Sequence, residues 1–197
     1  MQLIFIRHAE KTKPEPRHLN HVGRLRARFL VDYFNHPYDE FTRPTHAYIM
    51  QMPSHKSQRC IETMQPLIHA NCPSLRYELV PRYETHQLAA RLLDTIRTSQ
   101  SETASIVCWQ HSRIVDMLTT LGADVTAWGL DPDADGDDKD CFNATWVVCR
   151  VKHMLRLDVY RQFDIVDDQP VYTVPRNKVL FSKTWPIPRS SRSWCGF

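Results

Sequence analysis

Short apolar runs alternate with amphipathic segments over the first two thirds of the chain. Strand-length apolar runs, each bounded by polar residues, occupy positions 3–6, 47–50 and 104–109. Residues 75–80 alternate polar and apolar side chains, as a half-buried strand does. Apolar positions recur at helical spacing in segments 22–34, 88–96 and 114–121, and Pro53-Ser54 is a start signal for a further helix that extends to about residue 68. This alternation predicts an α/β fold, a three-layer α/β/α sandwich around a mostly parallel sheet.

The last third of the chain follows a different pattern. Residues 131–140 form an acidic loop, and residues 144–151 and 155–163 form two β-runs that we expect to pair as a hairpin and complete a mixed sheet. From residue 166 onward, four prolines interrupt a segment with few periodic apolar positions. We therefore predict one catalytic domain over residues 1–165, with residues 166–197 as an extended C-terminal arm packed on it or projecting from it.

Composition narrows the functional classes. The net charge of +3 comes from 25 basic and 22 acidic residues spread along 197 positions, so no basic block predicts binding to nucleic acid or to an anionic membrane. No segment has the roughly 20 apolar residues of a membrane span, and no secretory signal is visible. Six cysteines without a C-x-x-C pair favour reduced thiols. We expect a cytoplasmic protein that can bind a small anionic substrate.

Three groups of candidate residues follow the ends of predicted strands. Arg7 and His8 follow the first strand, Arg59 lies on the helix after the second, and His111 follows the strand at 104–109. In an open α/β sheet, ligands bind beyond the carboxyl ends of the strands, so these side chains are expected to meet. Each residue type alone is common in structural roles, but the combination at these positions indicates a functional site.

The combination suits phosphoryl transfer. The charge that spreads over the equatorial oxygens of a phosphoryl group needs fixed donors, and the planar guanidinium groups of Arg7 and Arg59 provide them. A neutral imidazole can attack phosphorus, and a second imidazole can stabilise the oxygens that are transferred. His8 and His111 are the candidates.

Four ordered motifs resemble those of a known family. The segment 3–11, with Arg7-His8-Ala9-Glu10-Lys11, is similar to the opening strand and Arg-His-Gly signature of the histidine phosphatase superfamily, with alanine in place of glycine. Segment 18–23 resembles its Leu-Thr-x-x-Gly motif, and segment 54–67 retains the motif residues Arg59, Thr63, Pro66 and Leu67. Segment 107–111 resembles the strand that ends in the family's second histidine. The resemblance covers about residues 1–151.

This resemblance implies a phosphoglycerate mutase-like fold and a phosphatase that needs neither metal nor cofactor. It implies His8 as the nucleophile, with Arg7, Arg59 and His111 forming the phosphate pocket. The implied reaction is hydrolysis of a phosphomonoester or of phosphohistidine through a phosphohistidine intermediate, with a small phosphorylated molecule or a phosphohistidine protein as substrate. Ser112 after the second histidine, in place of aspartate, favours the mutase and small-phosphatase branch.

Further residues are assigned around this pocket. Glu84 occupies about the position where many members of the family carry a proton donor, although a carboxylate there also favours a helix N-terminus. His86 is a reserve candidate for substrate contact, and Glu10 and Lys11 are predicted to bind substrate. The alternatives are a phosphoglycerate mutase-type phosphotransferase and a non-catalytic phosphate-binding or scaffold protein. No metal site is expected, because the acidic loop has Phe142 where a calcium loop needs glutamate.

Overall fold

The computed structural model describes residues 1–11, 17–35, 42–53, 55–71, 73–125, 144–172 and 178–188. The predicted acidic loop at 131–140 and the predicted helix start at Ser54 lie outside these ranges. The elements of the first two thirds are β1 (Gln2–Arg7), α1 (His21–Asn35), β2 (Pro44–Gln51), α2 (Arg59–Asn71), β3 (Arg76–Pro81), the 3₁₀ turn η1 (Arg82–Glu84), α3 (Thr85–Thr98), β4 (Ala104–Trp109) and α4 (His111–Thr120). The remaining strands are β5 (Ala144–Val151), β6 (Met154–Arg161), β7 (Asp164–Val166), β8 (Gln169–Val171) and β9 (Val179–Pro186).

A seven-stranded sheet in the order β3-β2-β4-β1-β5-β6-β9 forms the centre of the described fold. The strands β3, β2, β4 and β1 are parallel to one another. The strands β5, β6 and β9 are each antiparallel to the neighbour before them. The prediction of an α/β fold with a mainly parallel sheet and an added antiparallel hairpin is therefore confirmed.

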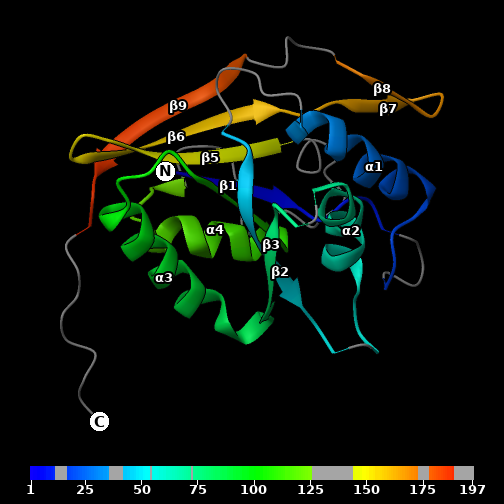
Figure 1. The fold of residues 1–197 in the computed structure, drawn as a ribbon, viewed down its shortest axis with the longest axis horizontal. Helices are drawn as coiled ribbons and strands as arrows, with labels where there is room; N and C mark the ends of the chain where they lie inside the picture. Colours follow the sequence, from blue (N-terminus) through cyan, green and yellow to red (C-terminus); the bar gives the residue numbers. More distant parts are fainter. Residues whose placement is uncertain are drawn as a thin grey trace.

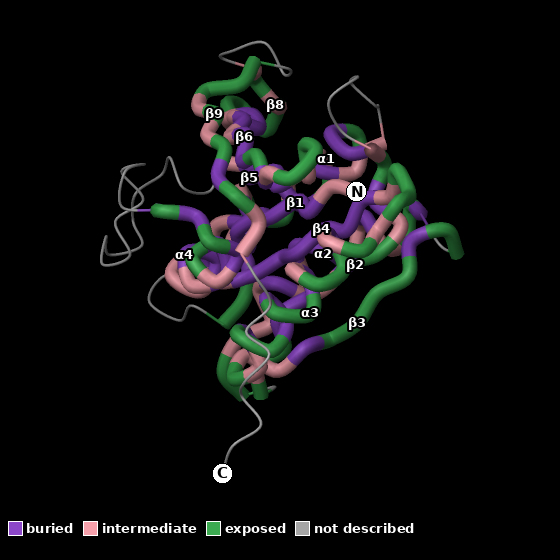
Figure 2. The backbone as a smooth tube through the Cα atoms, turned by 90° about the vertical axis from the view of Figure 1, so that its left-hand side faces the viewer, coloured by how far each residue is buried: buried purple, intermediate pink, exposed green. Residues whose placement is uncertain are grey.

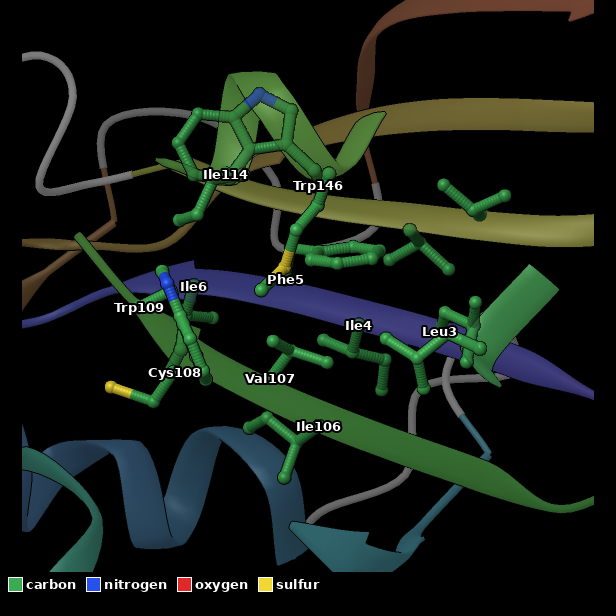
Figure 3. Packing of buried hydrophobic residues seen from close by; sticks show 14 of the residues in the cluster. Leu3, Ile4, Phe5, Ile6, Ile106, Val107, Cys108, Trp109, Ile114 and Trp146 are labelled. Carbon is green, nitrogen blue, oxygen red and sulfur yellow. The ribbon is translucent and has the colours of Figure 1, made fainter. Parts of the chain in front are cut away.

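The two central strands β1 and β4 are buried on both faces. Residues 3–7 of β1 and all six residues of β4 are buried, which is why both read as continuous apolar runs rather than alternating ones. Figure 3 shows their side chains in contact along the two neighbouring strands, with Trp146 of β5 and Ile114 of α4 packed nearby. This packing fixes the register in which Arg7 pairs with Trp109.

The helices pack in two pairs, α1 with α2 and α3 with α4. Figure 1 shows the two pairs on opposite sides of the parallel half of the sheet. Right-handed crossovers produce this arrangement, because the chain moves from β1 towards the β3 edge through α1 and α2 and returns to β4 through α3. A three-layer sandwich over the whole sheet stays a prediction.

The described part of the predicted C-terminal arm is built into the fold. Residues 164–171 form the β7–β8 hairpin, whose turn residues Asp167 and Asp168 both have positive φ, as a two-residue hairpin turn needs. Strand β9 extends the main sheet beside β6 and buries Trp185, whose indole nitrogen donates a 2.8 Å hydrogen bond to the carbonyl of Leu121. Figure 2 shows the outer strands β3 and β9 largely exposed, in contrast to the buried β1 and β4.

Candidate active site

The candidate site begins where β1 and β4 end side by side. The amide of His8 donates a 3.2 Å hydrogen bond to the carbonyl of Trp109, so the chain stays paired one residue beyond β1. After this point the chain continues towards α1 from β1 and towards α4 from β4, on opposite sides of the sheet. The crevice between two such diverging connections is the usual ligand site of open α/β sheets.

The imidazole of His8 is held in one tautomer. Its Nδ1 lies 2.8 Å from the carbonyl oxygen of Ala9, and because a carbonyl can only accept, Nδ1 carries the proton. Burial is the main cause that lowers the pKa of His8 to about 3, and the positive charges of Arg59, Arg7 and Lys11 contribute to the same shift. The ring is therefore neutral at ordinary pH, and Nε2 keeps its lone pair.

Arg59 is the first residue of α2, and this helix is fixed to the loop after His8. The Oγ1 of Thr63 accepts a 2.9 Å hydrogen bond from the amide of Ala9 and donates a 2.7 Å bond to the carbonyl of Arg59. The Nε of Arg59 donates to the Oγ of Ser57 at 3.0 Å. Partial burial lowers the pKa of the Arg59 guanidinium. The structure therefore brings Arg7, His8 and Arg59 into electrostatic contact.

The first turns of α1 hold the same loop from the other side. The carboxylate of Glu10 pairs with the buried Arg26 through contacts of 2.5 to 3.0 Å, and Arg26 also donates to the carbonyl of Phe163 at 2.6 Å. The side chain of Asn20 caps α1 by accepting the amide proton of Gly23 at 2.7 Å. Glu10 thus has a structural partner, and its predicted contact with substrate stays a prediction.

His111 is the first residue of α4 and only 6% exposed. Its ring centroid lies 6.4 Å from that of Trp146, on the strand that pairs with β1. Lys11 is half-buried, and its charge acts on the ring of His8. Both residues therefore lie at the carboxyl edge that the sequence predicted, where their proposed contacts with phosphate stay predictions.

A cleft of about 700 Å³ lies along this edge, beyond the ends of β2 and β3. Arg82, His86 and Arg113 are among its lining residues. Glu84 is not among the described lining residues, and its charge acts on Arg91 of α3. Nothing in this geometry assigns Glu84 the role of proton donor, so that role stays a prediction.

Arg82 and Arg113 line this cleft but were not predicted from the sequence as site residues. Both follow strand ends at the same edge: Arg82 directly follows β3, and Arg113 lies on the first turn of α4. The rule that ligands bind beyond the carboxyl ends of parallel strands was therefore the signal that could have found them. Arginine is common on exposed surfaces, so the rule needed the observed cleft to single them out.

No helix in the described part of the chain is long and apolar enough to cross a membrane. The described histidine, cysteine, aspartate and glutamate side chains form no group of three or more that could hold a metal ion.

The fold of this chain is similar to that of solved protein structures. No family model matches the chain, and no curated protein matches it. One similar solved structure is the protein histidine phosphatase SixA complexed with tungstate, with 14% identity, a TM-score of 0.52, and coverage of 75% of this chain and 87% of that chain. Another is a SixA protein from Nakamurella multipartitia, with 12% identity, a TM-score of 0.44, and coverage of 75% and 83%. The first likeness shows that the chain shares the fold of SixA.

Proposed function

We propose that the chain is a metal-independent phosphatase that hydrolyses a phosphomonoester or phosphohistidine through a phosphohistidine intermediate on His8. The geometry of His8 carries this proposal. Its buried imidazole is neutral, its Nδ1 proton is engaged by Ala9, and positive charges surround it. A nucleophile for a dianionic phosphoryl group needs all three conditions.

In the first step, Nε2 of His8 attacks phosphorus. The P–N bond to His8 forms as the bond from phosphorus to the leaving atom breaks. That atom is an oxygen in a phosphomonoester and an imidazole nitrogen in phosphohistidine. It departs with the electron pair, and the leaving group takes up a proton. Arg7 and Arg59 bind the equatorial oxygens, and His111 donates to one of them. The hydrogen bond from Nδ1 to Ala9 keeps the ring oriented while it gains positive charge.

In the second step, water attacks the phosphorus of the phosphohistidine. The P–N bond breaks, its electron pair returns to Nε2, and inorganic phosphate leaves after the attacking water loses a proton. The same arginines stabilise this second transition state, since the charge again spreads over the equatorial oxygens. His8 is then neutral and ready for another cycle.

Two kinds of similarity support this assignment, one in sequence motifs and one in fold. The segment 3–11 and the Arg59-to-Leu67 segment resemble histidine phosphatase motifs, and their motif residues Arg7 and Arg59 lie where β1 ends and where α2 begins. The SixA structure with the same fold is that of a protein histidine phosphatase, bound to the oxyanion tungstate. Phosphohistidine therefore belongs among the first substrates to test, beside phosphomonoesters.

The decisive experiment replaces the nucleophile. His8→Ala should abolish turnover of a substrate that the wild type hydrolyses, while binding of tungstate or vanadate persists through Arg7, Arg59 and His111. Rapid quench of the wild type should trap an acid-labile, base-stable phosphoprotein that the variant lacks. His153→Ala, which removes an exposed histidine in the turn between β5 and β6, is the matched control and should keep full activity.

Other outcomes would redirect the assignment. A His8→Ala protein with most of the wild-type rate would refute covalent catalysis at this residue. A wild type that binds oxyanions but hydrolyses none of the phosphate compounds would indicate a phosphate-binding module. Activity lost in chelator and restored by a divalent cation would overturn the metal-independent mechanism.

A further inference from the structure

The cleft beside the candidate phosphate site has the size of a small-molecule site. Its volume of about 700 Å³ lies within the range typical of ligand pockets. Residues at the ends of β2 and β3 and on the first turns of α3 and α4 line it. The cleft therefore lies along the same carboxyl edge as Arg7 and His8, displaced towards β3.

The arginine and histidine side chains described in this lining are basic, and no aspartate or glutamate is among its described residues. Arg82 comes from η1, His86 from the first turn of α3 and Arg113 from the first turn of α4. The amino ends of α3 and α4 add the positive end of each helix dipole. Two consecutive elements, η1 and α3, and the more distant α4 thus place basic side chains around one cleft.

The two arginines differ in how far they are already paired. Arg113 forms a 2.8 Å ion pair with Asp116, and both side chains are more than 30% exposed, so this pair is weak. The Nε of Arg82 is buried and has no hydrogen-bond partner among the described residues. A buried guanidinium nitrogen without a partner is costly, so the Arg82 side chain would gain stability by turning towards an anion in the cleft.

Hydrogen bonds connect the cleft-lining residues Arg82 and Thr85 to β4, the strand beside His8. The hydroxyl of Thr85 donates a 2.6 Å hydrogen bond to the carbonyl of Arg82 and accepts a 3.2 Å bond from the indole of Trp109. Trp109 is also the residue whose carbonyl accepts the amide proton of His8. Arg82 is thus positioned relative to His8 by a short chain of hydrogen bonds.

The cleft is separated from His8 by a definite distance. Its lining lies beyond the ends of β2 and β3, two and three strand spacings from β1, or about 10 to 14 Å. On the first turn of α4, His111 and Arg113 are two residues apart and face different sides of the helix. A group bound in the cleft therefore does not compete with the phosphate at His8, and a substrate that reaches both must be elongated.

We propose that this cleft is a second anion subsite, and that the substrate is a small phosphomonoester with another phosphate or carboxylate several atoms from the phosphate that is transferred. This inference rests on the proposed function. Arg82 and Arg113 bind the distal anion, and His86 adds a hydrogen-bond donor. These three are specificity residues and take no part in bond breaking.

The test compares substrates that share one leaving group. Hexyl phosphate and 1,6-hexanediol bisphosphate present the same alkyl oxygen to His8, and only the second carries a distal phosphate. With two equivalent phosphates, the bisphosphate gains twofold in kcat/KM by statistics alone. We expect a gain of about tenfold or more, as charge-assisted hydrogen bonds to the distal group would give. 6-Phosphonooxyhexanoate shows whether a carboxylate suffices.

Variants separate the subsite from general electrostatics. Arg82→Gln and Arg113→Gln should each lower the ratio of bisphosphate to monophosphate kcat/KM, and the double variant should bring it to the statistical twofold. Arg91→Gln is the control, because Arg91 lies on α3, is half-exposed, and pairs with Glu78 outside the cleft. It should leave the ratio unchanged. Thermal unfolding of each variant checks that the fold is intact.

Failure of the subsite and failure of the proposed function give different results. A wild-type ratio near two, or a ratio that the arginine variants leave unchanged, overturns the subsite while hydrolysis of hexyl phosphate upholds the phosphatase. If neither compound is hydrolysed, calorimetric titration of both compounds into the wild type tests the subsite alone. The subsite is then supported if the wild type binds the bisphosphate about tenfold more tightly than hexyl phosphate and the double variant loses this difference. Equal affinity for the two compounds overturns the subsite.

Discussion

The Thr63 hydroxyl joins the loop after His8 to the first turn of α2. It accepts from the amide of Ala9 and donates to the carbonyl of Arg59, and its residue is fully buried. Thr63→Val keeps the shape but leaves the Ala9 amide without an acceptor, at a cost of about 1–3 kcal/mol. We expect a lower free energy of unfolding and weaker vanadate binding. Urea unfolding and vanadate inhibition check this, and Thr63→Ser should preserve both properties.

The buried neutral ring of His8 makes stability depend on pH. Burial lowers its pKa from 6.5 to about 3, so between these values the unfolded chain binds a proton that the folded chain does not. The free energy of unfolding should therefore fall as the pH falls through this window. The contribution of His8 to the slope is at most about 1.4 kcal/mol per pH unit.

Unfolding of His8→Gln isolates this contribution. The glutamine does not titrate, so the variant should lose less stability than the wild type between pH 6.5 and 4. Urea denaturation at a series of pH values measures both slopes. Identical slopes would show that His8 is not buried in its neutral form.

At the residue scale, the strand-end rule led from the sequence to Arg7, His8, Arg59 and His111, and the structure places all four at one sheet edge. The partner of Glu10 could not be found in this way. Its ion pair with Arg26 depends on how α1 crosses the loop, and no local pattern encodes that crossing. For the same reason the sequence could not show that Glu84 acts on Arg91 rather than lining the cleft.

Among the elements, α1 approaches the loop after β1 closely, and this approach depends on Gly23. A Cβ at this position would lie 2.2 Å from the carbonyl oxygen of Glu10, which is backbone and cannot rotate away. Gly23→Ala should therefore cost about 1–3 kcal/mol and weaken oxyanion binding by displacing the loop that holds His8. Thermal unfolding and tungstate titration measure both effects.

A change on the opposite side of α1 provides the comparison. Arg28 is exposed, and Arg28→Ala should change the free energy of unfolding by no more than about 0.5 kcal/mol. If Gly23→Ala were equally mild, the packing of α1 on the loop after His8 would be looser than described.

The positions of the strands and helices in the parallel half could be predicted from the periodicity of apolar residues. Each central strand is buried on both faces, and each helix buries one continuous stripe of apolar side chains. The predicted runs at 104–109 and 144–151 coincide with β4 and β5. The pattern of apolar residues did not predict every strand whose side chains are mostly exposed. Strand β9 is mostly exposed, and only its pairing with β6 makes it part of the sheet, so its proline-flanked sequence indicated an arm.

Across the whole molecule, β9 connects the antiparallel half to the far end of α4. The indole of Trp185 donates to the carbonyl of Leu121, at the end of α4 opposite to His111 and about 15 Å from it along the helix. Trp185→Phe should lower the free energy of unfolding by about 1–3 kcal/mol, because a buried carbonyl loses its donor. The proposed phosphatase activity should not change at 25 °C. Activity lost in proportion to stability would show that the two ends of α4 are coupled.

The order of strands in the sheet also determines when the site can form during synthesis. Strand β4 lies between β2 and β1, although it follows both along the chain by more than 50 residues. Until residue 109 has left the ribosome, β1 and β2 have no partner for the edges that face each other, and such open edges favour association with other chains. Arg7, His8 and Arg59 are synthesised early, yet His111 joins them only through the slow pairing of distant strands. The proposed catalytic site should therefore form late in folding, together with closure of the sheet.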